Sequence, residues 1–152
     1  MTTSSSSPTS SWNDEVRRAI EIGPQSSARD RTIDVTTVGA KSGIARRIET
    51  WFYRFDGQVY LSGAPGRRSW YANLIANPEF VFHLKHGVQA DLQAIATPIA
   101  DAVDKRRILT GILADLNQPS NPARLSQPVG PLEDWVNGSP LAKVDFINPS
   151  GR

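Results

Sequence analysis

Two short glycine-bearing segments carry the side chains best suited to binding an anion. The first, residues 39–43 (GAKSG), places Lys41 and Ser42 ahead of Gly43 and is followed by Arg46. Lysine supplies a compact positive charge, the serine hydroxyl a hydrogen bond, and the planar guanidinium two donors that match a phosphate. Glycine leaves backbone amides open to such a ligand. The segment predicts a phosphate site; an ordinary hairpin turn with solvated basic residues is the alternative.

The second segment, residues 62–68 (SGAPGRR), joins a predicted strand to a predicted helix. The first amides of a helix are unpaired and the helix dipole is positive there, so anions bind at such junctions. A flexible connector whose arginines only maintain solubility is the alternative. Two basic loops on one small sheet together favour a phosphate-bearing ligand. The candidate binding residues of the second loop are Gly63, Ala64, Gly66, Arg67 and Arg68.

The helix predicted directly after this loop is short and begins with aromatic residues. Helical spacing puts Trp70, Asn73 and Leu74 roughly on one side. A tryptophan beside an anion-binding loop is suited to lining a flat aromatic ring. The spacing alone favours the other interpretation, in which Trp70 and Leu74 are core contacts.

Other ionisable residues give weaker signals. Glu49 lies in a predicted strand that is otherwise apolar and aromatic. Its side chain either faces the interior of the sheet fold or, more commonly, lies outside and pairs with an arginine such as Arg47 or Arg54. His83 and His86 flank a predicted hairpin, and we expect surface histidines without a role. No Ser/His/Asp or paired-carboxylate spacing predicts a hydrolase.

Composition excludes several other classes of protein. The chain has 152 residues, 39% hydrophobic and 21% charged, which is typical of a soluble globular protein. A net charge of +2 does not favour nucleic-acid binding, and the lack of cysteine excludes disulfides and cysteine–zinc sites. The sequence contains no apolar run of about 18 residues, so we expect no membrane-spanning helix. The N-terminus does not resemble a secretory signal. We therefore expect a cytoplasmic protein with a disordered tail at 1–10 and one domain at 11–152.

Hydrophobic periodicity predicts a β-rich domain with three helices. Ser11 is the expected cap of a first helix that ends at Gly23, and residues 25–30 are expected to be a linker. Ser69 is the expected cap of the short helix at 70–76. Asp101 opens the clearest amphipathic helix, whose expected apolar face contains Val103, Ile108, Ile112 and Leu116.

The predicted strands cover residues 33–37, 46–55, 58–62, 79–85, 88–96 and 141–147. Asp56-Gly57 is a strong signal for a tight hairpin turn, because glycine supplies positive φ. Residues 117–131 are expected to be a loop. Strands joined by hairpins, with helices inserted rather than alternating, indicate a mainly β (α+β) fold: a closed antiparallel barrel with accessory helices.

The segments TTVGAKSGIAR and SWYANLIANP, separated by a hairpin and a glycine-rich loop, resemble the deazaflavin (F420)-dependent nitroreductase and quinone reductase family. The resemblance covers roughly residues 33–96. It implies a split β-barrel of the FMN-binding type. It also implies hydride transfer from reduced coenzyme F420 to a nitroaromatic, quinone or similar small-molecule acceptor, and homodimers are frequent in this superfamily.

The resemblance assigns the cofactor's phosphate and acidic tail to the two basic loops, and a position beside the deazaflavin ring or substrate to Trp70. The implied cofactor-binding residues are Lys41, Ser42, Gly43, Arg46, Gly63, Ala64, Gly66, Arg67, Arg68, Trp70 and Asn73. An FMN-binding relative and a carrier without turnover are the alternatives.

The chain departs from the family pattern in four places. The family often has R-x-x-P-L after the first turn, whereas residues 46–50 here are RRIET. Ala40 replaces the arginine that usually precedes the lysine, and the glycine-rich loop is shorter than in better-known members. All three tyrosines, Tyr53, Tyr60 and Tyr71, precede the C-terminal region where some members carry substrate-side tyrosines. Trp135 is the only large aromatic residue in the corresponding late loop.

Overall fold

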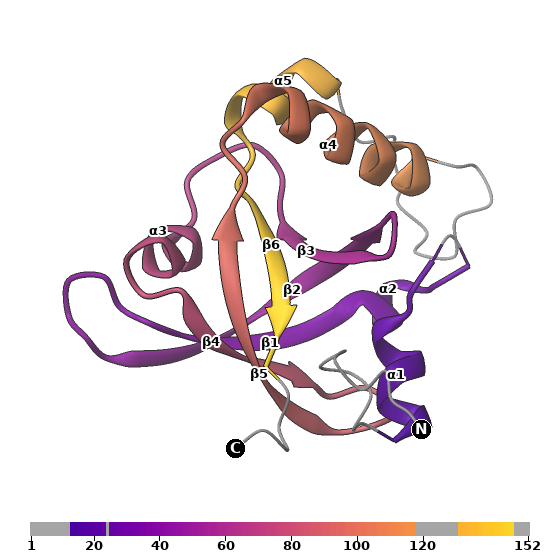
Figure 1. Ribbon diagram of the computed structural model, residues 1–152, viewed down its shortest axis with the longest axis vertical. Coiled ribbons are helices and arrows are strands. Elements are labelled where there is room, and N and C mark those ends of the chain that lie inside the picture. Colours follow the sequence, from indigo (N-terminus) through magenta and orange to yellow (C-terminus); the bar gives the residue numbers. More distant parts are fainter. Residues whose placement is uncertain (1–12, 24, 118–130, 148–152) are drawn as a thin grey trace, which may run out of the picture.

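The computed structural model describes residues 13–23, 25–117 and 131–147 (Figure 1). The expected tail at 1–10, the expected cap Ser11 and residues 118–130 of the expected loop lie outside these ranges.

The described residues form a closed barrel in which all paired strands are antiparallel (Figure 1). The strand order around the barrel is β1-β2-β3-β6-β5-β4, and β4 pairs with β1 to close it. The fold predicted from the sequence is therefore confirmed. The strands are β1 (Thr32–Val38), β2 (Ala45–Phe55), β3 (Gln58–Ser62), β4 (Glu79–Leu84), β5 (Ala90–Pro98) and β6 (Leu141–Phe146).

The barrel interior is filled by the side chains that point inward from each strand, alternating with more exposed ones. In β1 every second residue is buried, so Ile33 and Val35 point inward. Phe82 contacts both Phe52 and Phe146 edge-to-face, each with ring centroids 5.1 Å apart. Such pairs add to the free energy gained by burial. The core thus joins β2, β4 and β6 across the barrel.

The hairpin turns follow the predicted chemistry. Asp56 and Gly57 have φ of 54° and 77°, and Gly87 has φ of 81°. These positive values identify the β2–β3 and β4–β5 turns that the sequence predicts.

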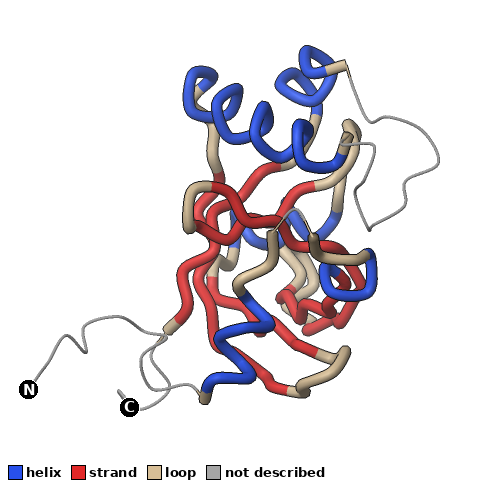
Figure 2. Tube along the Cα trace, turned by 90° about the vertical axis from the view of Figure 1, so that its right-hand side faces the viewer, coloured by secondary structure: helices blue, strands red, loops and turns tan. Residues whose placement is uncertain are grey.

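Helices cover one end and the flanks of the barrel. Figures 1 and 2 show α4 (Ala102–Leu116) and α5 (Leu132–Gly138) layered over one end, with α3 (Ser69–Ala76) at one side and α1 (Asp14–Ile20) towards the other end. A second core cluster lies beneath α4 and α5, and includes Ile108, Leu109, Trp135, Tyr60 and Leu141. No helix in the described part of the chain is long and apolar enough to cross a membrane.

Two helices of the structure were not predicted from the sequence. Residues 25–30 are not all linker, because α2 (Ala28–Arg31) forms on a capping box between Ser27 and Asp30. The second missed helix is α5, so Trp135 is not an aromatic residue of a loop. Its side chain lies in the core under α4 and is 4% exposed.

Three helix details also differ from the sequence prediction. Asn13, not Ser11, caps α1, and its side chain accepts a 2.9 Å hydrogen bond from the Val16 amide. Ser69 is the first residue of α3, whose N-cap position is Arg68 without a side-chain cap bond. Val103 is 76% exposed, because the buried face of α4 begins only at Ile108.

Candidate functional site

The β1–β2 turn presents the first group of predicted anion-binding residues at the surface. The Gly39 amide donates to the Ile44 carbonyl at 2.9 Å, and the Gly43 amide donates to the Gly39 carbonyl at 3.0 Å. Gly43 has φ of 70°, which an L side chain rarely adopts. The turn is thus fixed by its own backbone and depends on glycine.

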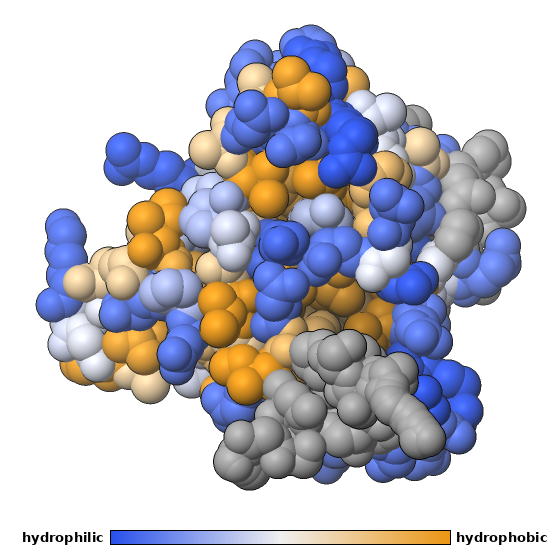
Figure 3. Space-filling model, in the orientation of Figure 1, coloured by the Kyte–Doolittle hydropathy of each residue, from blue (hydrophilic) through white to orange (hydrophobic). Residues whose placement is uncertain are grey.

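The side chains of this turn are not equally available to a ligand. The Ser42 hydroxyl accepts a 3.1 Å hydrogen bond from the Ile44 amide, and a Cβ at Gly39 would lie 2.4 Å from this oxygen. Ser42 therefore packs onto the turn. Lys41 and Arg46 are exposed, and neither forms an ion pair within the described residues. Figure 3 shows hydrophilic and hydrophobic side chains projecting together at the left, where Figure 1 places this turn.

The glycine-rich loop between β3 and α3 is filled by one of its own arginines. The Arg68 guanidinium donates to the Ala64 carbonyl at 2.8 Å and to the Arg67 carbonyl at 3.0 Å. A Cβ at Gly66, where φ is 138°, would lie 2.9 Å from Arg68 Nη1. The Gly66 amide also donates to the Gly138 carbonyl at 3.0 Å, which holds the loop against α5. Arg67 stays exposed, so it is the more available cation of the pair.

The aromatic start of α3 is divided between the core and the surface. Trp70 is buried within the barrel core and meets Tyr71 edge-to-face, with ring centroids 5.8 Å apart. This packing is the core contact that the spacing of Trp70 and Leu74 favours. Asn73 is half-buried and bonds to the β1–β2 region.

An open cleft of about 720 Å³ lies between α3, the start of α4 and the end of α5. Its volume is within the roughly 300–1,000 Å³ of small-molecule sites. It brings together Gly66, Arg67 and Arg68 from the predicted site. Residues of the β1–β2 turn do not line it. The other lining residues are Ser69, Tyr71, Ala72, Ile75, Lys105, Asn137, Gly138, Ser139 and Pro140.

Lys105 and Ser139 are candidate site residues that the sequence did not single out. Burial lowers the pKa of Lys105, whose side chain has no ion-pair partner within the described residues. The buried Ser139 hydroxyl has no hydrogen-bond partner there either. Neither signal is visible in sequence, because each depends on α4 or α5 packing beside α3. Burial also raises the pKa of Tyr71, against a backbone hydrogen bond at Leu141 that lowers it.

These features fit a phosphate-bearing aromatic cofactor. Arg67 and Lys105 provide cations without carboxylate partners, and Tyr71 and Ile75 provide apolar surface on the same cleft. The unpaired Ser139 hydroxyl is a polar group that a ligand or water would satisfy. The cleft therefore combines apolar walls with a few polar groups, as ligand sites do.

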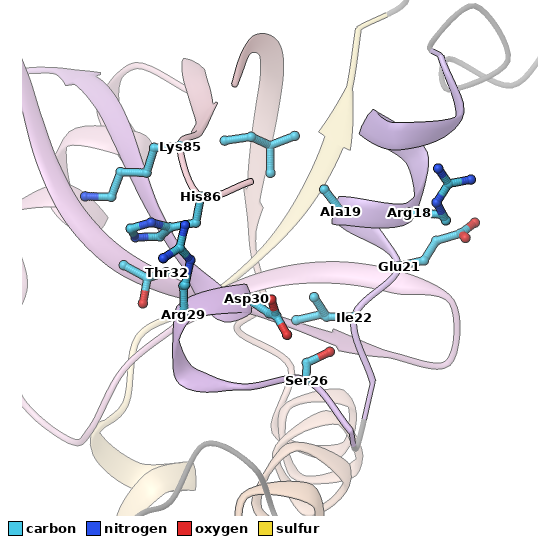
Figure 4. A pocket seen from close by; sticks show the side chains of 11 residues that line it. Arg18, Ala19, Glu21, Ile22, Ser26, Arg29, Asp30, Thr32, Lys85 and His86 are labelled. Carbon is cyan, nitrogen blue, oxygen red and sulfur yellow. The ribbon is translucent and has the colours of Figure 1, made fainter. Parts of the chain in front are cut away.

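Two other hollows are less suitable. Figure 4 shows a pocket between the α1–α2 region and the β4–β5 hairpin, lined by residues such as Arg18, Glu21 and His86. Its volume of about 90 Å³ is too small for a nucleotide-like cofactor. A second hollow, of about 470 Å³, is lined by Arg47, Lys85 and Asp91 among others. Its cations are already paired with carboxylates.

One sequence prediction is corrected on the outer face near this second hollow. Glu49 lies outside the barrel, but its ion-pair partner is Lys85, not an arginine. Arg47, one of the two arginines predicted as partners of Glu49, instead bonds Asp34 at 2.9 Å. Asp34 and Glu49 are cross-strand neighbours, and Lys85 pairs with both carboxylates.

His83 is not a surface histidine, since its side chain is buried. Its Nε2 lies 2.7 Å from Thr36 Oγ1 and its Nδ1 lies 2.7 Å from Asp91 Oδ1. The cross-strand pairing of β4 with β1 and β5 brings these three residues together.

The closed antiparallel barrel with flanking helices is a split β-barrel. Solved structures with this fold include a candidate 5-nitroimidazole antibiotic resistance protein from Bacteroides thetaiotaomicron (TM-score 0.56, 14% identity, covering 89% of this chain and 80% of that chain). An FAD-binding protein from Mesorhizobium loti is also similar (TM-score 0.57, 13% identity, 87% of each chain). So is the heme storage protein HutZ from Vibrio cholerae (TM-score 0.51, 12% identity, 78% of this chain and 84% of that chain). At these identities the likeness shows the fold alone.

The family is shown by a sequence model. The model described as F420H(2)-dependent quinone reductase matches residues 12–120. This match covers more than half of the 152 residues. The chain belongs to the F420H2-dependent quinone reductase family. None of the curated proteins matches it significantly.

Proposed function

We propose that this protein is an F420-dependent oxidoreductase that passes a hydride from reduced deazaflavin to a quinone, nitroaromatic or similar activated acceptor. The observation that carries the proposal is the cleft between α3, α4 and α5, where unpaired cations and apolar walls meet at the glycine-rich loop. Family membership identifies F420 as the expected cofactor.

The basic residues of the two loops are proposed to hold the anionic part of the cofactor. Lys41 and Arg46 are exposed on the β1–β2 turn, and Arg67 is exposed on the glycine-rich loop. Each is free of a carboxylate partner within the described residues, so binding a phosphate does not require breaking an ion pair. A charge-assisted hydrogen bond of this kind contributes roughly 1.5–3 kcal/mol.

The cleft walls are proposed to position the ring and the acceptor. Tyr71 and Ile75 offer apolar surface, and Lys105 and Ser139 offer a positive charge and a hydroxyl. When bound, the deazaflavin supplies the hydride. The Lys105 ammonium would stabilise the negative charge that develops on the acceptor oxygen.

Two alternatives remain open to experiment. An FMN-binding protein would use the same basic loops for a terminal phosphate, and the similarity to an FAD-binding structure motivates this test. A carrier would bind the cofactor without turnover.

Oxidation of reduced F420, followed by absorbance with a quinone and with a nitroaromatic, separates these functions. We expect protein-dependent oxidation with at least one acceptor. Binding of F420 without oxidation across an acceptor series would identify a carrier. Purification with bound FMN, recognised by its absorption, would replace F420 as the cofactor.

A further inference from the structure

Helix α3 contacts both basic loops. Asn73 Oδ1 accepts a hydrogen bond from the Ala40 amide at 3.0 Å, and Asn73 Nδ2 donates to Thr37 Oγ1 at 3.2 Å. One turn later, Asn77 Nδ2 donates to the Val38 carbonyl at 3.3 Å. The β1–β2 turn is therefore tied to α3 by two carboxamides.

The opposite end of α3 is joined to the glycine-rich loop. Arg68 occupies the N-cap position of the helix, and its guanidinium bonds to carbonyls within the loop. Leu74, fully buried beneath the helix, and Trp70 anchor α3 in the barrel core. Helix α3 thus connects the two loops.

Two of the four hydrogen-bonding positions of the Asn73 carboxamide are used inside the protein. A carboxamide has one acceptor oxygen and two N–H donors. The oxygen and one N–H of Asn73 are directed at Ala40 and Thr37. Both bonds hold the half-buried carboxamide against the β1–β2 region.

We propose that Asn73 is a positioning residue, which fixes the Lys41-bearing turn relative to the glycine-rich loop through its bonds to Ala40 and Thr37. The resemblance assigned Asn73 to direct cofactor binding; the geometry instead gives it an indirect part. The effect on cofactor affinity rests on the proposed function, whereas the effect on the turn does not.

The test uses full-length Asn73→Ala and Thr37→Val, the double variant, and Gln93→Ala as control. Thr37→Val removes only the hydroxyl partner of Asn73, at a side chain that is 2% exposed. Gln93 is an exposed carboxamide on β5 whose side chain is outside both loops.

The first readout, in cofactor-free protein, is cleavage after Lys41 by a lysine-specific protease. Cleavage after Lys143, which lies in β6, reports global unfolding.

We expect Asn73→Ala to raise the rate of cleavage after Lys41 about 3- to 10-fold, with little change in the barrel, because the two hydrogen bonds that tie the turn to α3 are lost. Thr37→Val should produce a smaller increase, and the double variant should not exceed Asn73→Ala. Unchanged cleavage after Lys41 in Asn73→Ala would overturn the proposal.

Fluorescence titration with F420 supplies the second readout. Positioning predicts that both Asn73→Ala and Thr37→Val weaken binding and that their effects are not additive. A direct ligand role predicts a loss in Asn73→Ala alone, and that result would overturn the proposal. If the wild type binds no F420 while cleavage after Lys41 still rises in Asn73→Ala, the proposed function fails and the positioning role stands.

Discussion

Gly111 of α4 lies directly against the ring of Phe55 at the end of β2. A Cβ at Gly111 would lie 2.1 Å from Phe55 Cε1 and 2.2 Å from Cδ1. Arg107, one turn earlier on α4, places its guanidinium 5.6 Å from the centre of the same ring. This close approach explains a glycine inside a helix, where it costs about 1 kcal/mol relative to alanine. The contact locks α4, which forms one wall of the cleft, onto the barrel.

Gly111→Ala is therefore expected to destabilise the protein despite the higher helix propensity of alanine. Overpacking against a ring typically costs about 1–3 kcal/mol, and over most of this range the cost exceeds the propensity gain of about 1 kcal/mol. Urea unfolding followed by circular dichroism measures the difference. Phe55→Leu in the Gly111→Ala background should recover part of the loss, since it removes the ring atoms that clash. A Gly111→Ala variant that is clearly more stable than wild type would show that α4 does not rest on Phe55.

Arg31 is a buried cation that joins the N-terminal segment to α4. Its side chain is 1% exposed and bonds to Asp115 Oδ2 at 3.0 Å, to the Gly23 carbonyl at 3.0 Å and to the Ser26 carbonyl at 3.2 Å. Arg31→Ala removes all three bonds, and we expect a loss of about 3 kcal/mol in the free energy of unfolding. Arg31→Lys should recover only part of it, because an ammonium does not reproduce the guanidinium fork. Equal stability of Arg31→Lys and wild type in urea would contradict this account.

Acid should weaken the ion-pair cluster on the outer face. Burial alone would raise the pKa of Asp34, but hydrogen bonds from Lys85 and Arg47 outweigh burial and hold the pKa below its usual 3.8. The stability that ionised Asp34 contributes is thus present above its unfolded pKa and is lost as pH falls through its lower folded pKa. Asp34→Asn should destabilise the protein more at pH 6 than near pH 3 in urea titrations. The control Asp145→Asn removes an exposed carboxylate 3.6 Å from Lys143. An Asp34→Asn effect that does not change with pH would exclude this linkage.

The four cations of the two basic loops should behave differently when removed. Lys41→Ala, Arg46→Ala and Arg67→Ala should each raise the Kd for F420 about tenfold or more with little change in stability, because their charges are exposed and unpaired. Arg68→Ala should both weaken F420 binding and lower the thermal midpoint, since it removes the bonds that fill the glycine-rich loop. Differential scanning fluorimetry beside fluorescence titration separates the two effects. Wild-type affinity in both Lys41→Ala and Arg46→Ala would mean that the β1–β2 turn is only a solvated hairpin.

Lys105 should give the cleft a pH dependence. Burial lowers its pKa, so its charge, and with it the affinity for an anionic ligand, is lost at a lower pH than for an exposed lysine. Titrations with F420 from pH 7 upward should show affinity falling in the wild type, and Lys105→Met should be weaker at pH 7 and less dependent on pH. Parallel pH profiles in the two proteins would remove Lys105 from the site.

The barrel was predictable because its strands and turns carry local signals. Alternation in β1 and the Asp56-Gly57 turn are each readable within a few residues. Helix α5 was not predicted, because its seven residues are stabilised by Trp135 packing under α4 rather than by propensity. Lys105 and Ser139 were not predicted as site residues for the same reason, because only tertiary packing brings them to the cleft. His83 was misjudged because its partners, Thr36 and Asp91, are contributed by two other strands.

The most direct test of the proposed function is a fluorescence titration of the purified full-length protein with F420, with FMN titrated in parallel. We predict saturable binding of F420 in the micromolar range or tighter, and much weaker binding of FMN. Stronger binding of FMN would keep the fold and replace the cofactor. Binding of neither would contradict the assignment of the cleft and the basic loops to a flavin-type cofactor.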